Sequence, residues 1–218
     1  MKTFLKPISF LLLMILMGSC KTDNKLELFN GENLDNWNIY VSSPDVEPGE
    51  LFWVEEGVIN TLGIPNGYIR TKETYSNFEL HVEWRWTGKP TNSGVLINVQ
   101  GKEMIWPLCI ECQLMNEKAG DIVLIGKSSG ITIQDTTYLV TSEENRYKVI
   151  PKFEDVSEKP AGEWNSYDIT VQGGNIEVLV NGILQNRGSA MTLSEGNIAL
   201  QSEGSAMQFR NITLIPLD

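Results

Sequence analysis

Hydrophobic and polar residues alternate one by one along most of this chain. From Phe78 to Trp86 every second residue is apolar, and charged residues or a histidine fill the positions between them. Shorter runs with the same period begin at Val95, Cys109 and Tyr167. A period of two places successive side chains on opposite faces of a β-strand, so that one face packs against a core. The pattern therefore predicts many half-buried strands.

Turn signals separate these runs. Asn181-Gly182 matches the type I′ hairpin turn, which needs positive φ at both central residues, and Gly173-Gly174 marks a second turn. No window of ten residues has helical periodicity, and only residues 142–148 resemble a short helical turn. Many short strands with regular turns predict one all-β domain, a sandwich of two antiparallel sheets.

The N-terminus has the pattern of a targeting segment. Lys2 and Lys6 precede an apolar run that ends at Gly18-Ser19-Cys20, and the run is shorter than the roughly 20 residues that span a bilayer. This ending resembles a bacterial lipobox, which implies a lipidated Cys20; a plain signal peptide is the alternative. We expect a lipoprotein signal peptide at 1–19, a lipidated tether at 20–26 and the domain at 27–218. The protein would then be a membrane-anchored lipoprotein of the cell envelope, periplasmic or on the outer-membrane surface.

Composition narrows the function classes. The 218 residues carry a formal net charge of -11, which argues against nucleic acid as a partner because such binding depends on Lys and Arg. His81 is the only histidine, so a multi-His metal site, or a catalytic triad without His81, is excluded. Cys109 and Cys112 are three apart on a predicted strand and point to opposite faces, which predicts two buried thiols and no disulfide between them.

Several stretches, taken together and in order, resemble one family. They are Leu28-Phe29-Asn30-Gly31, Asn92-Ser93-Gly94-Val95, Trp106-Pro107, Ile110-Glu111-Cys112-Gln113-Leu114-Met115, Ala119-Gly120-Asp121, Gly162-Glu163-Trp164-Asn165, Asn181-Gly182, Gly196-Asn197-Ile198-Ala199-Leu200-Gln201 and Phe209-Arg210-Asn211-Ile212. This series resembles the 3-keto-disaccharide hydrolases, also described as 3-keto-glucoside 1,2-lyases and 3-keto-2-hydroxyglucal hydratases. The resemblance covers about residues 27–218 and implies a concanavalin A-like jelly-roll fold that acts on an oligosaccharide or glycoside.

The chemistry that this resemblance implies is elimination next to a ketone. A keto group at C3 of a sugar acidifies the C2 proton, so a base can remove that proton and the C1 substituent can leave. Such a reaction needs one base, a donor for the enolate oxygen and an acid for the leaving oxygen.

The candidate catalytic residues lie on two predicted strands. Glu111 and Gln113 share the polar face of one strand, and Asn98 lies on the corresponding face of its neighbour. We expect Glu111 to be the base and Gln113 and Asn98 to be its hydrogen-bonding partners; a solvated outer face is the structural alternative. A divalent cation on Glu111 stays open, although no ligand spacing in the sequence indicates one.

Five further residues are candidates for binding substrate. Trp106 offers a stacking surface, and His81 has an ordinary pKa near neutrality. Arg85 and Lys127 are possible oxyanion partners, and Gln201 follows an alternating run that would turn it toward a cleft. Each also has a structural interpretation: a loop Trp that closes the core, charged surface residues, or a polar residue beside a strand ladder.

Two other functions fit the pattern. A non-catalytic sugar-binding module is favoured by Asn98 and Leu108, which stand where many members of the resembled family carry basic residues. A retaining glycosidase is suggested by Glu111 and Glu117, which approximate the E-x-D-x-x-E of laminarinase-type enzymes, but here Gln113 replaces the middle acid. Six residues of strand also span about 20 Å, whereas a retaining pair needs about 5–5.5 Å.

Overall fold

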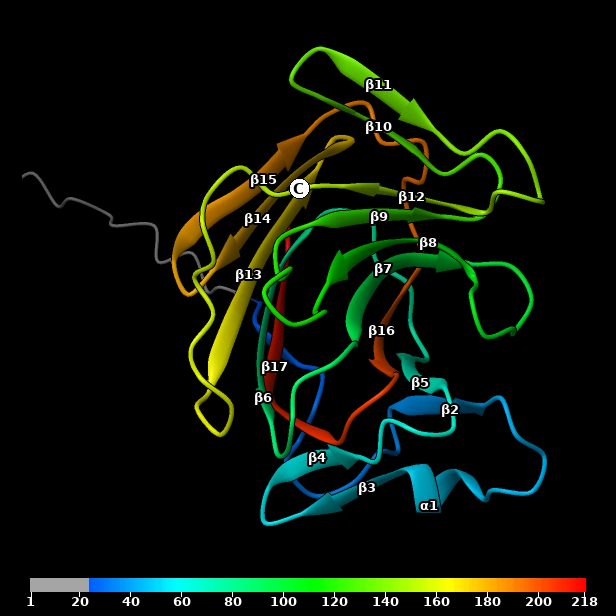
Figure 1. Ribbon diagram of the computed structural model, residues 1–218, viewed down its shortest axis with the longest axis vertical. Coiled ribbons are helices and arrows are strands. Elements are labelled where there is room, and N and C mark those ends of the chain that lie inside the picture. Colours follow the sequence, from blue (N-terminus) through cyan, green and yellow to red (C-terminus); the bar gives the residue numbers. More distant parts are fainter. Residues whose placement is uncertain (1–23) are drawn as a thin grey trace, which may run out of the picture.

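The computed structural model describes residues 24–218, which form two antiparallel β-sheets packed face to face (Figure 1). The predicted signal peptide and Cys20 lie outside the described residues. Leu26, the last residue of the predicted tether, already pairs with Leu214. In the part of the chain that is described, no helix has the length and apolar character needed to cross a bilayer.

The first sheet has eight strands. They are β1 (Leu26–Glu27), β3 (Phe52–Glu55), β4 (Val58–Thr61), β6 (Phe78–Trp86), β13 (Asn165–Gln172), β14 (Asn175–Val180), β15 (Ile183–Gly188) and β17 (Met207–Pro216). Their order is β15-β14-β13-β6-β17-β4-β3, with β1 beside β17. This sheet stands at the left of Figure 1 and turns to the lower edge at β4 and β3.

The second sheet has seven strands and carries the candidate site. They are β2 (Trp37–Val41), β5 (Gly67–Thr71), β7 (Gly94–Gln100), β8 (Leu108–Gln113), β9 (Ile122–Ile125), β12 (Tyr147–Ile150) and β16 (Asn197–Ser202). Their order is β12-β9-β8-β7-β16-β5-β2. A separate hairpin of β10 (Gly130–Ile133) and β11 (Thr136–Leu139) covers one end of the molecule (Figure 1).

The main core fills the space between the two sheets. On β6 the apolar members of the alternating run, Phe78, Leu80, Val82, Trp84 and Trp86, are all buried. The prediction of an all-β sandwich is confirmed. The two predicted turns join β13 to β14 and β14 to β15, and both residues of each turn have positive φ.

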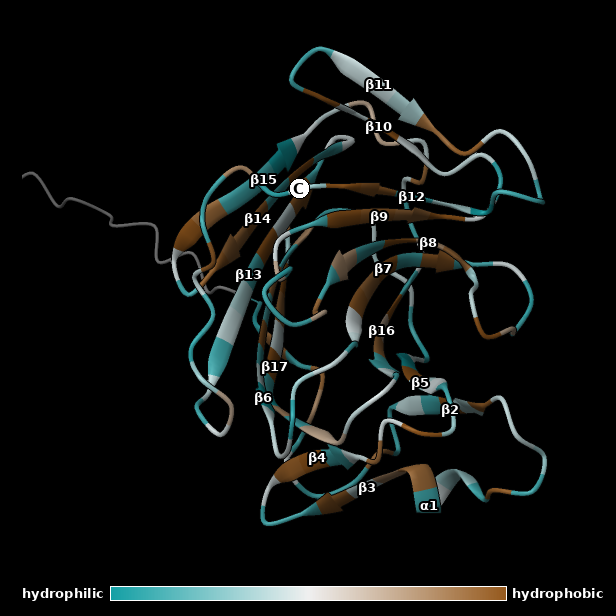
Figure 2. Cartoon of the chain, in the orientation of Figure 1, coloured by the Kyte–Doolittle hydropathy of each residue, from teal (hydrophilic) through white to brown (hydrophobic). Residues whose placement is uncertain are grey.

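The second sheet is buried on part of its outer face as well. A second apolar cluster, built around Leu96, Cys109, Val123 and Ile125, lies on the side turned away from the main core. The strand β9 is accordingly hydrophobic along its whole length (Figure 2). Cys112 belongs to the main core, so the two cysteines do point to opposite faces and both are free thiols.

The helical expectation was wrong at residues 142–148. Tyr147 begins strand β12, where its side chain and that of Val149 stand beside β9. The described chain instead has one short helix, α1 (Pro48–Leu51), where the sequence pattern indicated none. Pro48 occupies its first turn, and the Glu47 N–H donates to the Glu50 carboxylate at 3.1 Å. Four residues are too few to give a periodic signal.

Strand β7 contains a bulge that the alternation does not show. Asn98 has φ of 51°, and the pairing register with β8 shifts between Ile97 and Gln100. Val99, expected on the core face with Ile97, therefore joins the outer cluster beside Leu96. A bulge adds one residue to a strand and reverses the alternation after it.

Candidate active site

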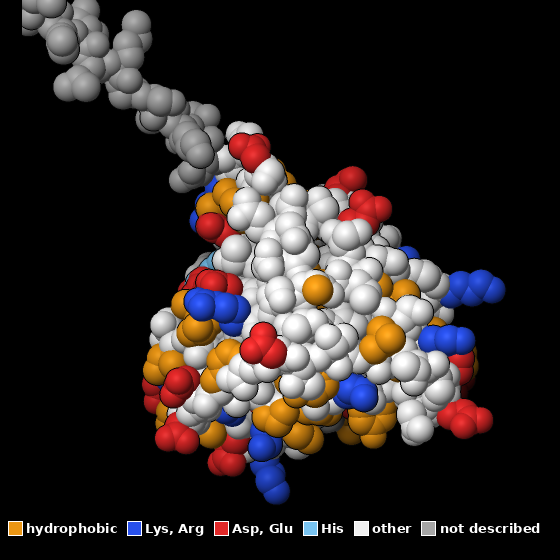
Figure 3. All heavy atoms as spheres, turned by 90° about the horizontal axis from the view of Figure 1, so that it is seen from above, with side chains coloured by type: hydrophobic (Ala, Val, Ile, Leu, Met, Phe, Trp, Pro, Cys, Tyr) orange, Lys and Arg blue, Asp and Glu red, His pale blue; other side chains and the backbone are white. Residues whose placement is uncertain are grey.

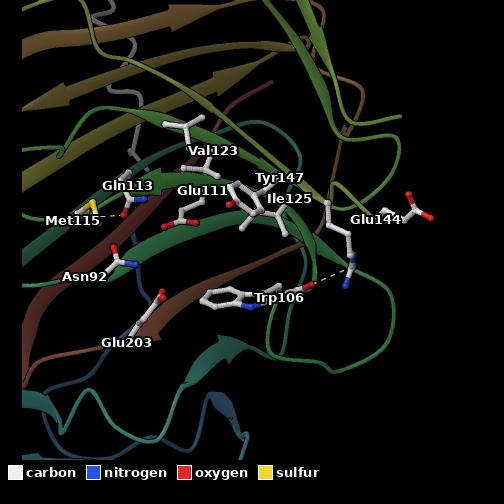
Figure 4. Close-up of a pocket in the computed structure, with 12 residues that line it drawn as sticks. Asn92, Trp106, Glu111, Gln113, Met115, Val123, Ile125, Glu144, Tyr147 and Glu203 are labelled. Carbon is white, nitrogen blue, oxygen red and sulfur yellow. Dashed lines mark hydrogen bonds between the residues drawn. The ribbon is translucent and has the colours of Figure 1, made fainter. Parts of the chain in front are cut away.

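A cavity of about 540 Å³ lies on the outer face of the second sheet. Strands β8, β9 and β12 supply its floor and one wall, and Trp106 stands on the opposite side of Glu111 (Figure 4). Its lining residues are Asn92, Trp106, Glu111, Gln113, Met115, Val123, Ile125, Glu144, Arg146, Tyr147, Val149 and Glu203.

Glu111 occupies the centre of this floor. It lies on β8 between Leu96 of β7 and Val123 of β9. Its side chain crosses the backbone of Gly94, where a Cβ atom would stand 2.8 Å from the Glu111 Cδ. The carboxylate therefore depends on a glycine at that position to reach the cavity.

The environment of Glu111 changes its acidity. The residue is 4% exposed, and burial, together with the nearby Glu203 carboxylate, raises the pKa of Glu111 to about 8. Burial also raises the pKa of Glu203, while a hydrogen bond from Asn92 acts in the opposite direction. A carboxyl group that ionises near neutral pH is suited to acid–base catalysis.

Gln113 is held at the edge of the same floor by one hydrogen bond to a chain neighbour and one to the facing sheet. Its side-chain oxygen accepts the Met115 N–H at 2.9 Å, and its carbonyl accepts the Tyr167 hydroxyl from the facing sheet. In Figure 4 the side-chain nitrogen of Gln113 is directed toward Glu111. The amide N–H groups are thus available to donate to a bound oxygen.

Beside Glu111 the sheet buries polar atoms that have no protein partner. Gln201 is 2% exposed, and neither atom of its amide makes a hydrogen bond. The same holds for the hydroxyl of its strand neighbour Tyr68 and for the side-chain oxygen of Asn92. Unsatisfied buried groups cost about 1–3 kcal/mol each, so a cluster of them indicates a place where a polar ligand or water binds.

The structure brings together three of the predicted site residues and separates the others. Glu111, Gln113 and Trp106 line the cavity, and Gln201 lies on the same face of the sheet. Asn98 was expected there too, but the bulge turns its side chain to the Leu193 carbonyl, to which it donates at 2.7 Å.

The remaining candidates lie elsewhere. His81 stands on the outer face of the first sheet, where its Nδ1–H donates to Asp168 at 2.6 Å; this bond raises the pKa of His81, while burial lowers it. Arg85, on the same strand, stacks over Trp164 with 4.6 Å between its guanidinium carbon and the ring centre. Lys127 is exposed after β9. None of the three lines the cavity around Glu111.

Sequence reasoning missed Glu203 and the apolar half of the cavity. The run Ala199, Gln201, Glu203 has period two, and that pattern could have placed Glu203 on the face of Gln201. Glu117, the second acid of the laminarinase-like spacing, is exposed in the turn after β8 and does not line the cavity. Among residues 24–218 no three His, Cys, Asp or Glu side chains group as metal ligands would.

The model of the 3-keto-alpha-glucoside-1,2-lyase-like domain matches residues 25–215. The chain belongs to this family. The membership confirms the resemblance found in the sequence and identifies the chain as a member of a carbohydrate-active family. No curated protein matches this member.

Solved structures agree on the fold of this family member. A candidate glycosyl hydrolase from Parabacteroides distasonis is 24% identical, with a TM-score of 0.63 over 88% of this chain and 99% of that chain. A Bacillus licheniformis β-glucanase is 12% identical, with a TM-score of 0.58 over 91% of this chain and 100% of its own. A carbohydrate-binding module from Bacillus subtilis is 10% identical, with a TM-score of 0.58 over 84% and 98% of the two chains. The jelly-roll sandwich predicted from the sequence is confirmed, and the fold serves both enzymes and binding modules.

Proposed function

We propose that this protein cleaves 3-keto-glycosides by elimination. Glu111 takes the C2 proton, and the electron pair of the broken C2–H bond is delocalised onto the C3 oxygen as an enolate. The enolate then re-forms the ketone, C1 and C2 become doubly bonded, and the C1–O bond breaks. The leaving oxygen departs with the bonding pair and takes up a proton, which gives a free alcohol and a 3-keto-2-hydroxyglucal. Addition of water across the new double bond completes a net hydrolysis.

One observation carries this proposal: a buried glutamate of raised pKa at the centre of a polar and apolar cavity. Glu111 ionises near pH 8 and makes no hydrogen bond that would occupy its carboxylate in the described chain. The Gln113 N–H groups are suited to bind the enolate oxygen, and Glu111, once it has taken the C2 proton, is suited to give a proton to the leaving oxygen. Asn92, rather than Asn98, lies where a positioning amide is needed.

The test is release of alcohol from a 3-keto-glucoside by variants of the full domain. Glu111→Gln keeps the shape and removes the base, so kcat should fall by about 10²–10⁴-fold while KM changes little. Gln113→Ala should chiefly raise KM. Glu117→Gln is the matched control, since it removes an exposed carboxylate outside the cavity and should leave both constants unchanged. Full activity in Glu111→Gln would show that another group is the base.

A conventional glycosidase is the second candidate, because the carboxyl groups of Glu111 and Glu203 both line the cavity. Glu111 stays protonated at neutral pH because burial and the nearby Glu203 carboxylate raise its pKa, which resembles the acid and carboxylate pair of such enzymes. The unoxidised glucoside separates the two candidates. It lacks the acidified C2 proton, so elimination predicts no turnover of it, whereas a glycosidase would cleave it. A protein that binds both sugars and turns over neither would be a binding module.

A further inference from the structure

Glu111 lies at a boundary between an apolar and a polar half of the same sheet face. The pairing register places Val123 of β9 directly beside Glu111, and Val149 of β12 directly beside Val123. On the other side of Glu111, across β7, the face carries Gln201 and Tyr68. Figure 4 shows the same division, with Ile125 and Tyr147 on one side of the carboxylate and Gln113 and Asn92 on the other.

The apolar half extends beyond the buried outer cluster to exposed side chains on the edge strand β12. Val123 and Ile125 are buried in the outer cluster, but Tyr147 and Val149 on the edge strand remain 70% and 48% exposed. These two residues pair with Ile125 and Val123, so four apolar side chains form one continuous surface. Contiguous exposed apolar surface beside a cavity typically marks a binding region.

Apart from the Tyr147 hydroxyl, polar groups reach this surface only at its rim. Arg146 and Glu144 also line the cavity, yet the Arg146 guanidinium donates to the Trp106 carbonyl at 3.4 Å and lies 3.3 Å from Glu143. Among the four side chains only Tyr147, through its phenolic hydroxyl, can make a hydrogen bond. A sugar ring placed there would have to leave several hydroxyl groups without partners, at a cost for each one.

The polar half has the opposite character. The Gln201 amide, the Tyr68 hydroxyl and the Asn92 side-chain oxygen are buried there without partners. Burial is the main reason that the pKa of Tyr68 is raised to about 12, so its hydroxyl stays neutral and can both donate and accept. Asn92 lines the cavity and suits a hydroxyl or the ketone of one sugar ring, whereas Gln201 and Tyr68 lie outside the lining and would meet the sugar through a bridging water.

We propose that the substrate is a 3-keto-glucoside with an apolar, aryl or alkyl, leaving group, and not a disaccharide. This inference rests on the proposed function and adds to it the substrate class. The keto-sugar binds over Gln201, Tyr68 and Asn92. The leaving group binds over Val123, Ile125, Tyr147 and Val149, with the Trp106 ring opposite. Glu111 lies between the two, at the bond that breaks.

The experiment compares two 3-keto-glucosides, one with a 4-nitrophenyl and one with a glucosyl leaving group. A series of 3-keto-glucosides with leaving groups from methyl to aryl measures how far the acidity of the leaving group alone changes kcat/KM. After correction for that effect, we expect kcat/KM to be at least tenfold higher for the aryl compound. The variant Val149→Thr makes the apolar surface polar without a change of shape. It should lower kcat/KM for the aryl compound by about tenfold, the size expected of one group in an apolar pocket, and should not lower kcat/KM for the glucosyl compound by as much.

Ile183→Thr is the matched control, because Ile183 is also 48% exposed but lies in the β14–β15 hairpin, outside the cavity. It should leave both substrates unchanged. Equal turnover of the aryl and glucosyl compounds, with no selective effect of Val149→Thr, would overturn the inference and leave the elimination intact.

A calorimetric arm separates this inference from the proposed function. Binding of the unoxidised 4-nitrophenyl glucoside and of a glucosyl disaccharide is measured with the wild type and with Val149→Thr. If no keto-sugar is turned over, the proposed function fails. The inference then holds as a binding preference only if the aryl ligand binds more tightly and Val149→Thr weakens it, and equal affinities would overturn it.

Discussion

At the scale of the residue, the chemistry depends on how one carboxyl group is surrounded. Glu111 is flanked by apolar neighbours, faces a second carboxylate in Glu203 and lies over Gly94. The sequence indicated Glu111 and Gln113 because period two and the family motif both applied to that strand. It could not indicate the raised pKa, because burial by β9 and the approach of Glu203 come from segments far apart along the chain.

The pH dependence of the reaction follows from that surrounding. A base must be ionised, so kcat/KM for a 3-keto-glucoside should rise about tenfold per pH unit below pH 8 and level off above it. Glu203→Gln removes a negative charge that raises the pKa of Glu111, and the rise should therefore move to lower pH. Steady-state kinetics between pH 5 and 10 with a substrate that does not ionise measures both effects. A plateau already reached at pH 5.5 would exclude Glu111 as the base.

At the scale of the element, the strands were predictable and their irregularities were not. The alternation in β6 and β13 was read directly from the sequence, since one face of each strand is buried. The bulge at Asn98 was not, because asparagine tolerates positive φ yet also occurs in regular strands. Because the bulge was not predicted, Asn98 was expected in the site and Val99 in the main core, whereas Val99 lies in the outer cluster. Tyr147 was assigned to a helical turn for a related reason, because an edge strand with one exposed face has a weak pattern.

The bulge gives Asn98 a structural role that can be measured. Asn98→Ala removes its hydrogen bond to the buried Leu193 carbonyl and places a residue with a Cβ but no polar group at φ 51°. The free energy of unfolding should fall by about 1–3 kcal/mol, while KM at a temperature where the variant is folded stays the same. Asn98→Gly is the control for backbone strain: it loses the same bond and tolerates the conformation. Denaturant unfolding measures the loss, and a raised KM with unchanged stability would restore Asn98 to the site.

At the scale of the whole molecule, the class of fold was predictable but the pairing of its strands was not. The site draws on Asn92, Glu111 and Glu203, which lie in three separate segments brought together by the order β8-β7-β16. Local alternation carries no information on that order. On the face seen in Figure 3, Lys and Arg side chains stand singly among acidic ones, and no basic stripe of the kind that nucleic acid requires is visible there.

Membrane attachment of the molecule remains a prediction from the sequence. Cys20 follows Met17-Gly18-Ser19, so cells given a labelled fatty-acid analogue should incorporate it into the wild type. Cys20→Ala should abolish the label, and Cys109→Ala is the control because that thiol is buried in the domain. Equal labelling of wild type and Cys20→Ala would contradict the lipoprotein assignment.

The position of the last two strands has a consequence for how the chain is made. Strand β17 lies between β6 and β4 at the centre of one sheet, and β16 lies between β7 and β5 at the centre of the other. During synthesis neither sheet can close until residues 197–216 have left the ribosome, since each earlier half exposes the edges that these strands will cover. Folding is therefore dominated by contacts between distant parts of the chain, which makes it slow and late. A chain cut short before Asn197 lacks the centre of both sheets rather than a dispensable end.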